Sequence, residues 1–298
     1  MGEEICLPAD PQRLLFPGDV GPIAMALGAA PVGYDRYMQM FSWDYPGVLE
    51  LPRMEGVPYV GFLPRDDLET VATVAPDLII SESYWPDLNE NLAKIAPTVV
   101  VDTDHANAWR VRQDAVAAIL DREEESAALI AGLEARLASV RDRLGDDPPT
   151  FAIAQSVGET DTVRIHTVAG LGASVFEMAG MSVAPGVLAP DGAVAAGGDV
   201  WTYDLSLERV GDIAADYIFA VRDWGDDPKM GIFDEAVWTV SPALADSTIV
   251  RVDRNVRPFV GEYIQNAHWL IDLVYREVLG LDPQEVDPNP FAAWLPTE

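Results

Sequence analysis

The sequence predicts an α/β protein of two similar lobes, each with a mainly parallel sheet flanked by helices, joined by one long helix. Two observations carry this prediction. A segment of the first half recurs in the second half, and an amphipathic stretch without proline separates the two copies. The 298 residues leave room for two lobes of roughly 100 to 150 residues, each able to bury its own apolar core.

The repeat aligns residues 67–85 with residues 206–224 without a gap. Seven aligned pairs are identical, namely Leu68/Leu207, Glu69/Glu208, Val71/Val210, Ala75/Ala214, Asp77/Asp216, Ile79/Ile218 and Trp85/Trp224. Each copy reads as a short helix, a continuously apolar strand and an aromatic loop. A continuously apolar strand after a helix is typical of a buried parallel sheet. More loosely, residues 24–33 resemble residues 176–184, so each half is expected to form a similar α/β unit.

The stretch between the copies predicts a long helix. Residues 109–144 contain no proline, and apolar side chains recur every three or four positions, with a break near Asp121. The part from 123 to 144 is followed by Gly145 and two prolines, as at a helix stop, and would extend about 33 Å. We therefore expect an N-terminal lobe at 1–120, an interlobe helix at 121–146 and a C-terminal lobe at 147–298.

The composition argues against several classes of function. The chain has 49 acidic and 19 basic residues, a net charge of -30, which repels nucleic acid phosphates and anionic membranes. No Gly-x-Ser-x-Gly elbow, P-loop or Cys/His nucleophile pair is present, so we expect no enzyme activity. The three histidines, at 105, 166 and 268, lack metal-ligand spacing. We expect no bare metal ion and no intrinsic cofactor, with haem ligation by His166 as the alternative.

Five segments, taken in order, carry a resemblance to a known family. They are PQRLL at 11–15, LGAAPVGY at 27–34, LETVATVAPDLII at 68–80, IAPTVVVD at 95–102 and WTVSPAL at 238–244. Together they resemble the helical-backbone class of ABC substrate-binding proteins, which includes those for ferric siderophores, haem and vitamin B12. The resemblance covers nearly the whole chain and implies two Rossmann-like lobes in the helical-backbone periplasmic binding protein fold.

The resemblance also implies a function. The chain would be the extracytoplasmic binding subunit of an ABC importer, capturing an iron–siderophore chelate in the interlobe cleft and delivering it to the permease. Two alternatives stay open: haem or cobalamin binding by the same fold, and a cytosolic two-lobed α/β enzyme. No export signal is visible at the N-terminus, so we expect a signal segment or a lipoprotein anchor to have been removed. We expect the protein to be a monomer in the periplasm or at the cell surface.

In this family one glutamate on each lobe docks into arginine pockets of the membrane permease. The motif positions match Glu69 and Glu208, which the internal repeat also pairs. Two carboxylates on separate lobes can make charge-assisted contacts with a two-fold permease dimer. The alternative is that each is a solvated residue in a first helical turn, favoured by the helix dipole.

Ligand residues are expected in the loops beyond the carboxyl ends of the strands. Aromatic rings there suit stacking, and arginines suit the oxygens of a chelate. The expected ligand residues are Tyr37, Trp43, Trp85, Arg164, Trp201, Arg222, Trp224 and Arg257. Arg222 is the strongest of them because it directly follows an apolar strand. The alternatives are ordinary packing for the aromatic residues and solvation or an Asp223 ion pair for Arg222.

Overall fold

The computed structural model describes residues 7–63, 68–102, 109–157, 161–167, 170–187, 202–223 and 231–296. The chain forms two compact units. Unit 1 comprises Met1–Ile130 and Phe291–Glu298, and unit 2 comprises Ala131–Pro290. The boundary between them falls inside the long helix α6 (Glu123–Leu144). The predicted long helix is thus present, while the predicted lobe limits stay a prediction.

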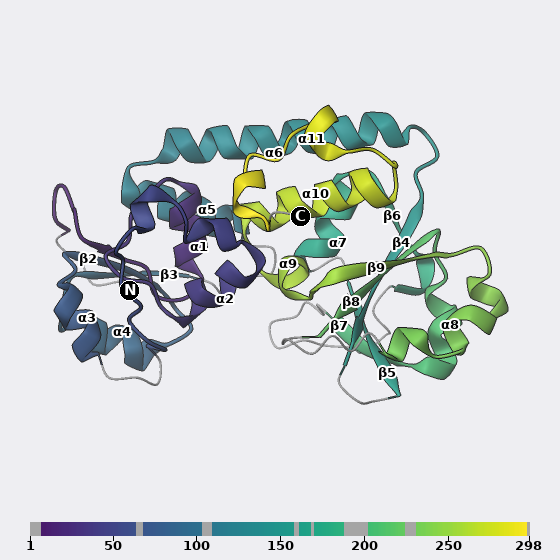
Figure 1. Cartoon of the computed structure of the whole chain (residues 1–298), viewed down its shortest axis with the longest axis horizontal. Coiled ribbons are helices and arrows are strands. Elements are labelled where there is room, and N and C mark those ends of the chain that lie inside the picture. Colours follow the sequence, from purple (N-terminus) through teal and green to yellow (C-terminus); the bar gives the residue numbers. More distant parts are fainter. Residues whose placement is uncertain are drawn as a thin grey trace. The chain divides into compact units, whose positions relative to one another are not determined.

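Unit 1 contains, among its described residues, a three-stranded parallel sheet in the order β1-β2-β3. Figure 1 labels β2 and β3 of this sheet. Its strands are β1 (Leu14–Leu15), β2 (Leu78–Glu82) and β3 (Thr98–Val101). Its helices are α1 (Val20–Ala26), α2 (Arg36–Asp44), α3 (Glu69–Val74), α4 (Pro86–Leu92) and α5 (Trp109–Leu120), with 3-10 turns η1 (Pro46–Val48), η2 (Pro52–Met54) and η7 (Ala292–Trp294). Every residue of β2 is buried, as expected for a central strand in contact with both α1 and α4.

Unit 2 contains a larger sheet in the order β7-β5-β4-β8-β9, and β6 also pairs with β4. The strands are β4 (Thr150–Ser156), β5 (Thr162–His166), β6 (Ser182–Val183), β7 (Thr202–Ser206), β8 (Tyr217–Arg222) and β9 (Thr248–Asn255). Pairing is parallel at β6-β4-β8-β9 and antiparallel where β5 meets β4 and β7. The sheet is therefore mixed, with β5 running against its neighbours.

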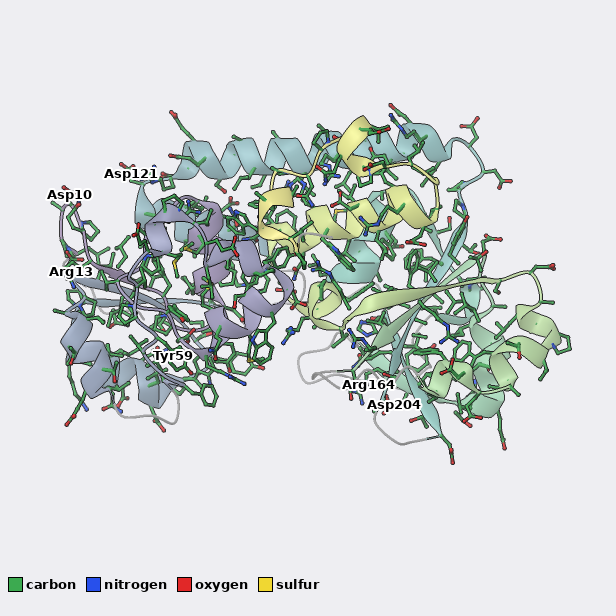
Figure 2. The ribbon with its side chains drawn as sticks, in the orientation of Figure 1. Asp10, Arg13, Tyr59, Asp121, Arg164 and Asp204 are labelled. Atoms are coloured by element: carbon green, nitrogen blue, oxygen red, sulfur yellow. The ribbon has the colours of Figure 1, made fainter. Side chains whose placement is uncertain are left out.

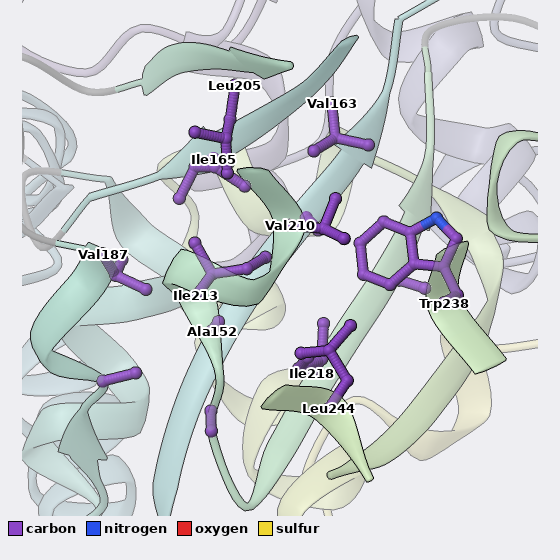
Figure 3. Close-up of a cluster of buried hydrophobic side chains, with 14 of the residues drawn as sticks. Ala152, Val163, Ile165, Val187, Leu205, Val210, Ile213, Ile218, Trp238 and Leu244 are labelled. Atoms are coloured by element: carbon purple, nitrogen blue, oxygen red, sulfur yellow. The ribbon is translucent and has the colours of Figure 1, made fainter. Parts of the chain in front are cut away.

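Helices cover both faces of this sheet. The helical elements of unit 2 are α7 (Leu171–Met178), α8 (Val237–Val240), α9 (Arg257–Val260), α10 (Ile264–Glu277), α11 (Pro283–Val286), η3 (Pro185–Val187), η4 (Leu207–Ile213), η5 (Gly231–Asp234) and η6 (Pro242–Leu244). On one face, Ile165, Ile218 and Trp238 belong to one cluster of buried hydrophobic side chains (Figure 3). On the other, the rings of Phe176 and Phe219 lie 4.6 Å apart. Burial on both faces explains the apolar run in β8.

The internal repeat corresponds to equivalent structure in the two units. Strands β1-β2-β3 have the same order and direction as β4-β8-β9. The carboxylate of Asp77 accepts bonds from the backbone N–H groups of Gln12 and Arg13, each at 2.9 Å. Its repeat partner Asp216 accepts from the backbone N–H of Thr150 at 2.7 Å and from its hydroxyl at 2.8 Å. Each aspartate thus secures the start of the neighbouring strand.

The looser similarity between residues 24–33 and 176–184 also has a structural counterpart. Helices α1 and α7 are each followed by a glycine with positive φ, Gly28 at 84° and Gly180 at 98°. The next residue, Ala29 or Met181, donates its N–H to a carbonyl in the preceding helix at 3.0 Å. This is the left-handed ending for which glycine is favoured. Both helices therefore stop in the same way before the chain joins the sheet.

The two copies differ in helix type. The first forms the α-helix α3, whereas the second forms the 3-10 helix η4. In η4, Gly211 stands where α3 has Ala72, and glycine lowers α-helix propensity. The first copy also ends with Ala75 in the left-handed region, at φ 44°, whereas Ala214 has φ -54°. The two connections therefore reach their strands along different paths.

The predicted break near Asp121 is confirmed. Helix α5 ends at Leu120, and Asp121 has φ 54° before α6 begins at Glu123 (Figure 2). The predicted stop is confirmed as well, because α6 ends at Leu144 and Gly145 has φ 73°. No helix in the described ranges combines the length and apolar character needed to span a bilayer.

A buried polar network fixes the unit 2 part of α6 to α10. Arg136 Nη2 lies 2.6 Å from Asp272 Oδ1, and both side chains are almost fully buried. Arg136 Nη1 donates to the carbonyl of His268 at 3.1 Å. The second carboxylate oxygen of Asp272 accepts from Asn289 Nδ2 at 2.7 Å. The network supplies partners to charges whose burial would otherwise be costly.

Candidate functional site

The carboxyl end of the unit 1 sheet carries two buried carboxyl groups on either side of a tight turn. Asp35 caps helix α2 and accepts bonds from the N–H groups of Gly18, Tyr37 and Met38 at 2.9 to 3.1 Å. Glu82 is the last residue of β2 and only 3% exposed. Gly18 has φ 74°, and a Cβ there would lie 2.2 Å from Glu82 Oε1. Glycine is therefore required at this position.

Burial changes the acidity of these groups. It raises the pKa of Asp35 to about 7, although three backbone N–H groups act in the opposite direction. Burial, followed by the charge of Asp19, raises the pKa of Glu82 to about 8. The N–H of Asp19 and the charge of Arg112 oppose this increase. Burial likewise raises the pKa of Tyr37 to about 12, and the nearby acidic groups add to the effect.

Aromatic rings gather beside these carboxyl groups. The rings of Tyr37 and Trp85, two of the predicted ligand residues, lie 5.0 Å apart. Phe62 lies 5.9 Å from Tyr37, and Tyr84, which is 68% exposed, lies 6.2 Å from Trp85. Such a partly exposed cluster can stack against a planar or apolar ligand. Trp43, the third predicted aromatic residue of unit 1, is 42% exposed on α2.

The carboxyl end of the unit 2 sheet carries basic and polar groups. Arg222 ends β8, and its buried Nε has no hydrogen-bond partner within the described part of the chain. The adjacent Asp223 accepts from Gln155 Nε2 at 2.8 Å, and its N–H donates to Ser156 Oγ at 3.0 Å. Gln155 Oε1 lies 2.9 Å from Nε2 of the buried His166. The end of β8 is thus tied to β4 and β5.

His166 is the neutral member of this network. Burial, together with the charge of Arg164, lowers its pKa to about 4. Because Gln155 donates to Asp223 through its amide, its oxygen is the atom facing His166, which must then donate through Nε2. That nitrogen is engaged, which argues against its use as a haem ligand. No group of three or more His, Cys, Asp or Glu in the described ranges could hold a metal ion.

The other predicted ligand residues are placed differently. Arg164 lies on β5 with its guanidinium bonded to Asp204 of β7, at 2.8 and 3.2 Å (Figure 2). Arg257 is partly buried at the start of α9, just beyond β9. Trp201 and Trp224 lie outside the described residues. Arg164, Arg222 and Arg257 are therefore at or near the edge where the sheet's parallel strands end.

The predicted docking carboxylates occupy matching positions in the repeat. Glu69 is the first residue of α3, and Glu208 lies in the first turn of η4. Both are exposed, as a surface contact requires. These positions are equally consistent with the alternative that each glutamate is a solvated residue favoured by the helix dipole.

Sequence reasoning missed Asp35, Glu82 and the residues bonded to Asp223. Two signals could have indicated the first pair. Asp35 stands directly before the α2 helix, where a capping residue is expected. Glu82 is a charged residue at the end of a continuously apolar strand, where burial is unusual without a special role. Gln155 and Ser156 gave no such signal, because their bonds to Asp223 depend on the pairing of β4 with β8.

Comparison with known proteins gives the family. The model of a family described as "Periplasmic binding protein" matches residues 57–254. The probable siderophore-binding lipoprotein YfiY of Bacillus subtilis (strain 168) is 30% identical over 149 residues, covering 49% of this chain and 44% of the relative. The iron(3+)-hydroxamate-binding protein FhuD of the same organism is 26% identical over 192 residues, covering 62% and 58%. The chain thus spans about half the length of these two relatives.

Solved structures show the same fold. Staphylococcus aureus SirA complexed with staphyloferrin B matches with a TM-score of 0.69 and 18% identity, over 92% of this chain and 95% of that one. A FhuD fold-family protein of Bacillus subtilis matches with a TM-score of 0.72 and 22% identity, over 91% and 95%. The predicted fold class is confirmed. The chain belongs to the periplasmic binding protein family, whose members are substrate-binding components of ABC transporters and not enzymes.

Proposed function

We propose that this chain is the extracytoplasmic binding subunit of an ABC importer and that it captures a ferric siderophore. The family supports the first part of the proposal, and the siderophore and iron–hydroxamate ligands for which its relatives are named support the second. The observation that carries most weight is Arg222, whose buried Nε–H lacks an acceptor among the described residues. A buried donor without a partner is costly, and an oxygen-rich chelate would supply the acceptor.

The proposed ligand contacts come from residues of both units, and the ligand would be captured between the lobes. In unit 1, Tyr37 and Trp85 offer ring faces for stacking. In unit 2, arginine side chains offer N–H groups to hydroxamate, catecholate or carboxylate oxygens. Arg222 would donate directly. Arg164 already holds Asp204, so it would contribute through its remaining N–H groups. Trp43, Trp201, Trp224 and Arg257 remain proposed members of the same set.

Delivery to the permease is the second step of the proposal. Glu69 and Glu208 would each make charge-assisted contacts with arginines of the permease dimer. Their exposure and their equivalent positions in the two units support this role. The protein would act outside the cytoplasm, in the periplasm or anchored at the cell surface, because that is where an importer receives its substrate.

A binding titration tests the ligand assignment. Tryptophan quenching should detect binding of at least one ferric chelate from a panel of hydroxamate, catecholate and citrate types, with haem and cobalamin included. Arg222→Ala should weaken that binding by roughly 1 to 3 kcal/mol, about 5- to 150-fold in Kd, because a charged hydrogen bond is lost.

The matched control is Arg209→Ala. Arg209 is an exposed arginine of unit 2 that pairs with Asp212 on η4. Its loss should leave the affinity unchanged. Equal affinity of wild type and Arg222→Ala would remove Arg222 from the site, and binding of haem or cobalamin alone would overturn the siderophore assignment.

A further inference from the structure

The carboxyl end of β2 places several acidic groups around one turn with little room between them. Glu82 and Trp85 both pack closely against Gly18. A Cβ added at Gly18 would lie 2.2 Å from Glu82 Oε1 and 2.9 Å from Trp85 Cζ3. The N–H of Gly18 is bonded to Asp35 at 2.9 Å on the other side. A change in the charge of Glu82 must therefore alter the packing of the turn and of the Trp85 ring.

The charges facing Glu82 are mostly of its own sign. Asp19 comes from the turn before α1, Asp35 from the start of α2, and Arg112 from α5. Tyr37 of α2 and Tyr84 beyond β2 are further titratable groups of this cluster. The charges of Asp19 and Asp35 therefore oppose ionisation of Glu82, and the charge of Arg112 favours it. Ionising Glu82, which is only 3% exposed, without rearrangement is unfavourable.

We propose that Glu82 is a proton-dependent positioning residue: its neutral form packs against Gly18 and Trp85, and loss of its proton opens the turn and displaces the Trp85 ring. The raised pKa of Glu82, about 8, supports this role because it puts the change close to neutral pH. Trp85 is stacked against Tyr37, so its displacement alters the aromatic cluster as a whole. Proton loss would thus weaken binding of any ligand that stacks on these rings.

The test follows Trp85 directly. Labelling the eight tryptophans with 5-fluorotryptophan gives separate fluorine NMR signals, and Trp85→Phe assigns the relevant one. In the wild type, the Trp85 signal should move with a midpoint near pH 8. In Glu82→Gln this step should vanish, because the amide cannot ionise. A motionless Trp85 signal in the wild type, or the same midpoint in Glu82→Gln, would overturn the inference.

Two further variants show whether a lost pH step comes from the missing Glu82 carboxyl or from a folding defect. Asp19→Asn keeps the Glu82 carboxyl and removes a charge that raises its pKa, so the midpoint should move to lower pH. An unchanged midpoint in this variant would contradict the inference that the charge of Asp19 raises the pKa of Glu82. Glu90→Gln removes an exposed carboxylate of the adjacent helix α4 and should behave as wild type.

The consequence for binding rests on the proposed function. With a ferric trihydroxamate as probe, wild-type affinity should fall by about fivefold between pH 7 and pH 9, because one pKa unit of difference between free and bound forms gives tenfold only well above both pKa values. Glu82→Gln should show constant affinity. Constant affinity in the wild type would overturn the coupling, whereas failure of every chelate to bind at any pH would overturn the proposed function and leave the NMR result standing.

Discussion

Asp77 and Asp216 illustrate, at the scale of single residues, why the two halves share certain side chains. Each carboxylate accepts bonds from the backbone at the start of the adjacent strand. Backbone N–H groups at a strand start lack a ladder partner on one side, and a carboxylate satisfies them. The identity of these two positions in the sequence therefore reflects the same local requirement in both sheets.

Replacing either aspartate with alanine should lower the free energy of unfolding by about 1 kcal/mol, a modest value because both carboxylates reach solvent. The bonds from Thr150 hold the pKa of Asp216 below its usual range. The stabilisation by Asp216 is therefore present at neutral pH and is lost as pH falls through that lowered pKa. Urea denaturation at pH 7 measures the loss.

Asp246→Ala provides the comparison, because Asp246 is an exposed aspartate of unit 2 outside the strands. Its effect should stay within about 0.5 kcal/mol. Equal stability of Asp77→Ala, Asp216→Ala and Asp246→Ala would show that the strand-start bonds contribute nothing measurable.

The candidate site was only partly predictable at this scale. Tyr37 and Trp85 were expected from their place after apolar segments, and the structure brings them into contact. The carboxyls of Asp35 and Glu82 were not expected, because their importance depends on Gly18 lying between them. A sequence pattern indicates which residues follow a strand, but not which distant turn packs on them.

At the scale of elements, helix α6 and the repeated strands follow from periodicity. Apolar residues at helical spacing and a continuous apolar run are local signals, so β2, β8 and α6 could be located from the sequence. The strands β5 and β7 could not. Their pairing with β4 is set by contacts far apart in the chain, and β7 is exposed enough that its apolar residues do not form a run. The 3-10 geometry of η4 likewise depends on its surroundings.

The network between α6 and α10 gives a prediction for these elements. Arg136→Met should lower the free energy of unfolding by about 3 to 5 kcal/mol, because Asp272 is left as a buried charge without its cation. The double variant Arg136→Met/Asp272→Leu should recover much of the loss, since both charges are then removed. Chemical denaturation of the two variants measures the difference. A double variant less stable than the single one would contradict this explanation.

At the scale of the whole molecule, the proposed importer role depends on one carboxylate in each unit. Glu69→Ala/Glu208→Ala should reduce uptake of a ferric chelate by roughly tenfold or more while leaving chelate affinity intact, because only the permease contacts are lost. Uptake in cells carrying the cognate permease gives the readout.

Glu90→Ala/Glu235→Ala is the matched variant, with one exposed glutamate changed in each unit. Uptake should then remain at the wild-type level. If the Glu69/Glu208 variant also imports normally, these two residues only occupy favourable helix starts and the docking role is wrong.

The antiparallel strand β5 sets the unit 2 sheet apart from the strand arrangement that the two units share. The three parallel strands β1-β2-β3 of unit 1 match β4-β8-β9 of unit 2, and β5 with β7 extends the unit 2 sheet beyond this shared part. This added ribbon carries Arg164 and His166, and through Gln155 it reaches the end of β8. The proposed ligand residues of unit 2 therefore fall on both parts of its sheet, Arg222 on the shared strand β8 and Arg164 on the additional strand β5.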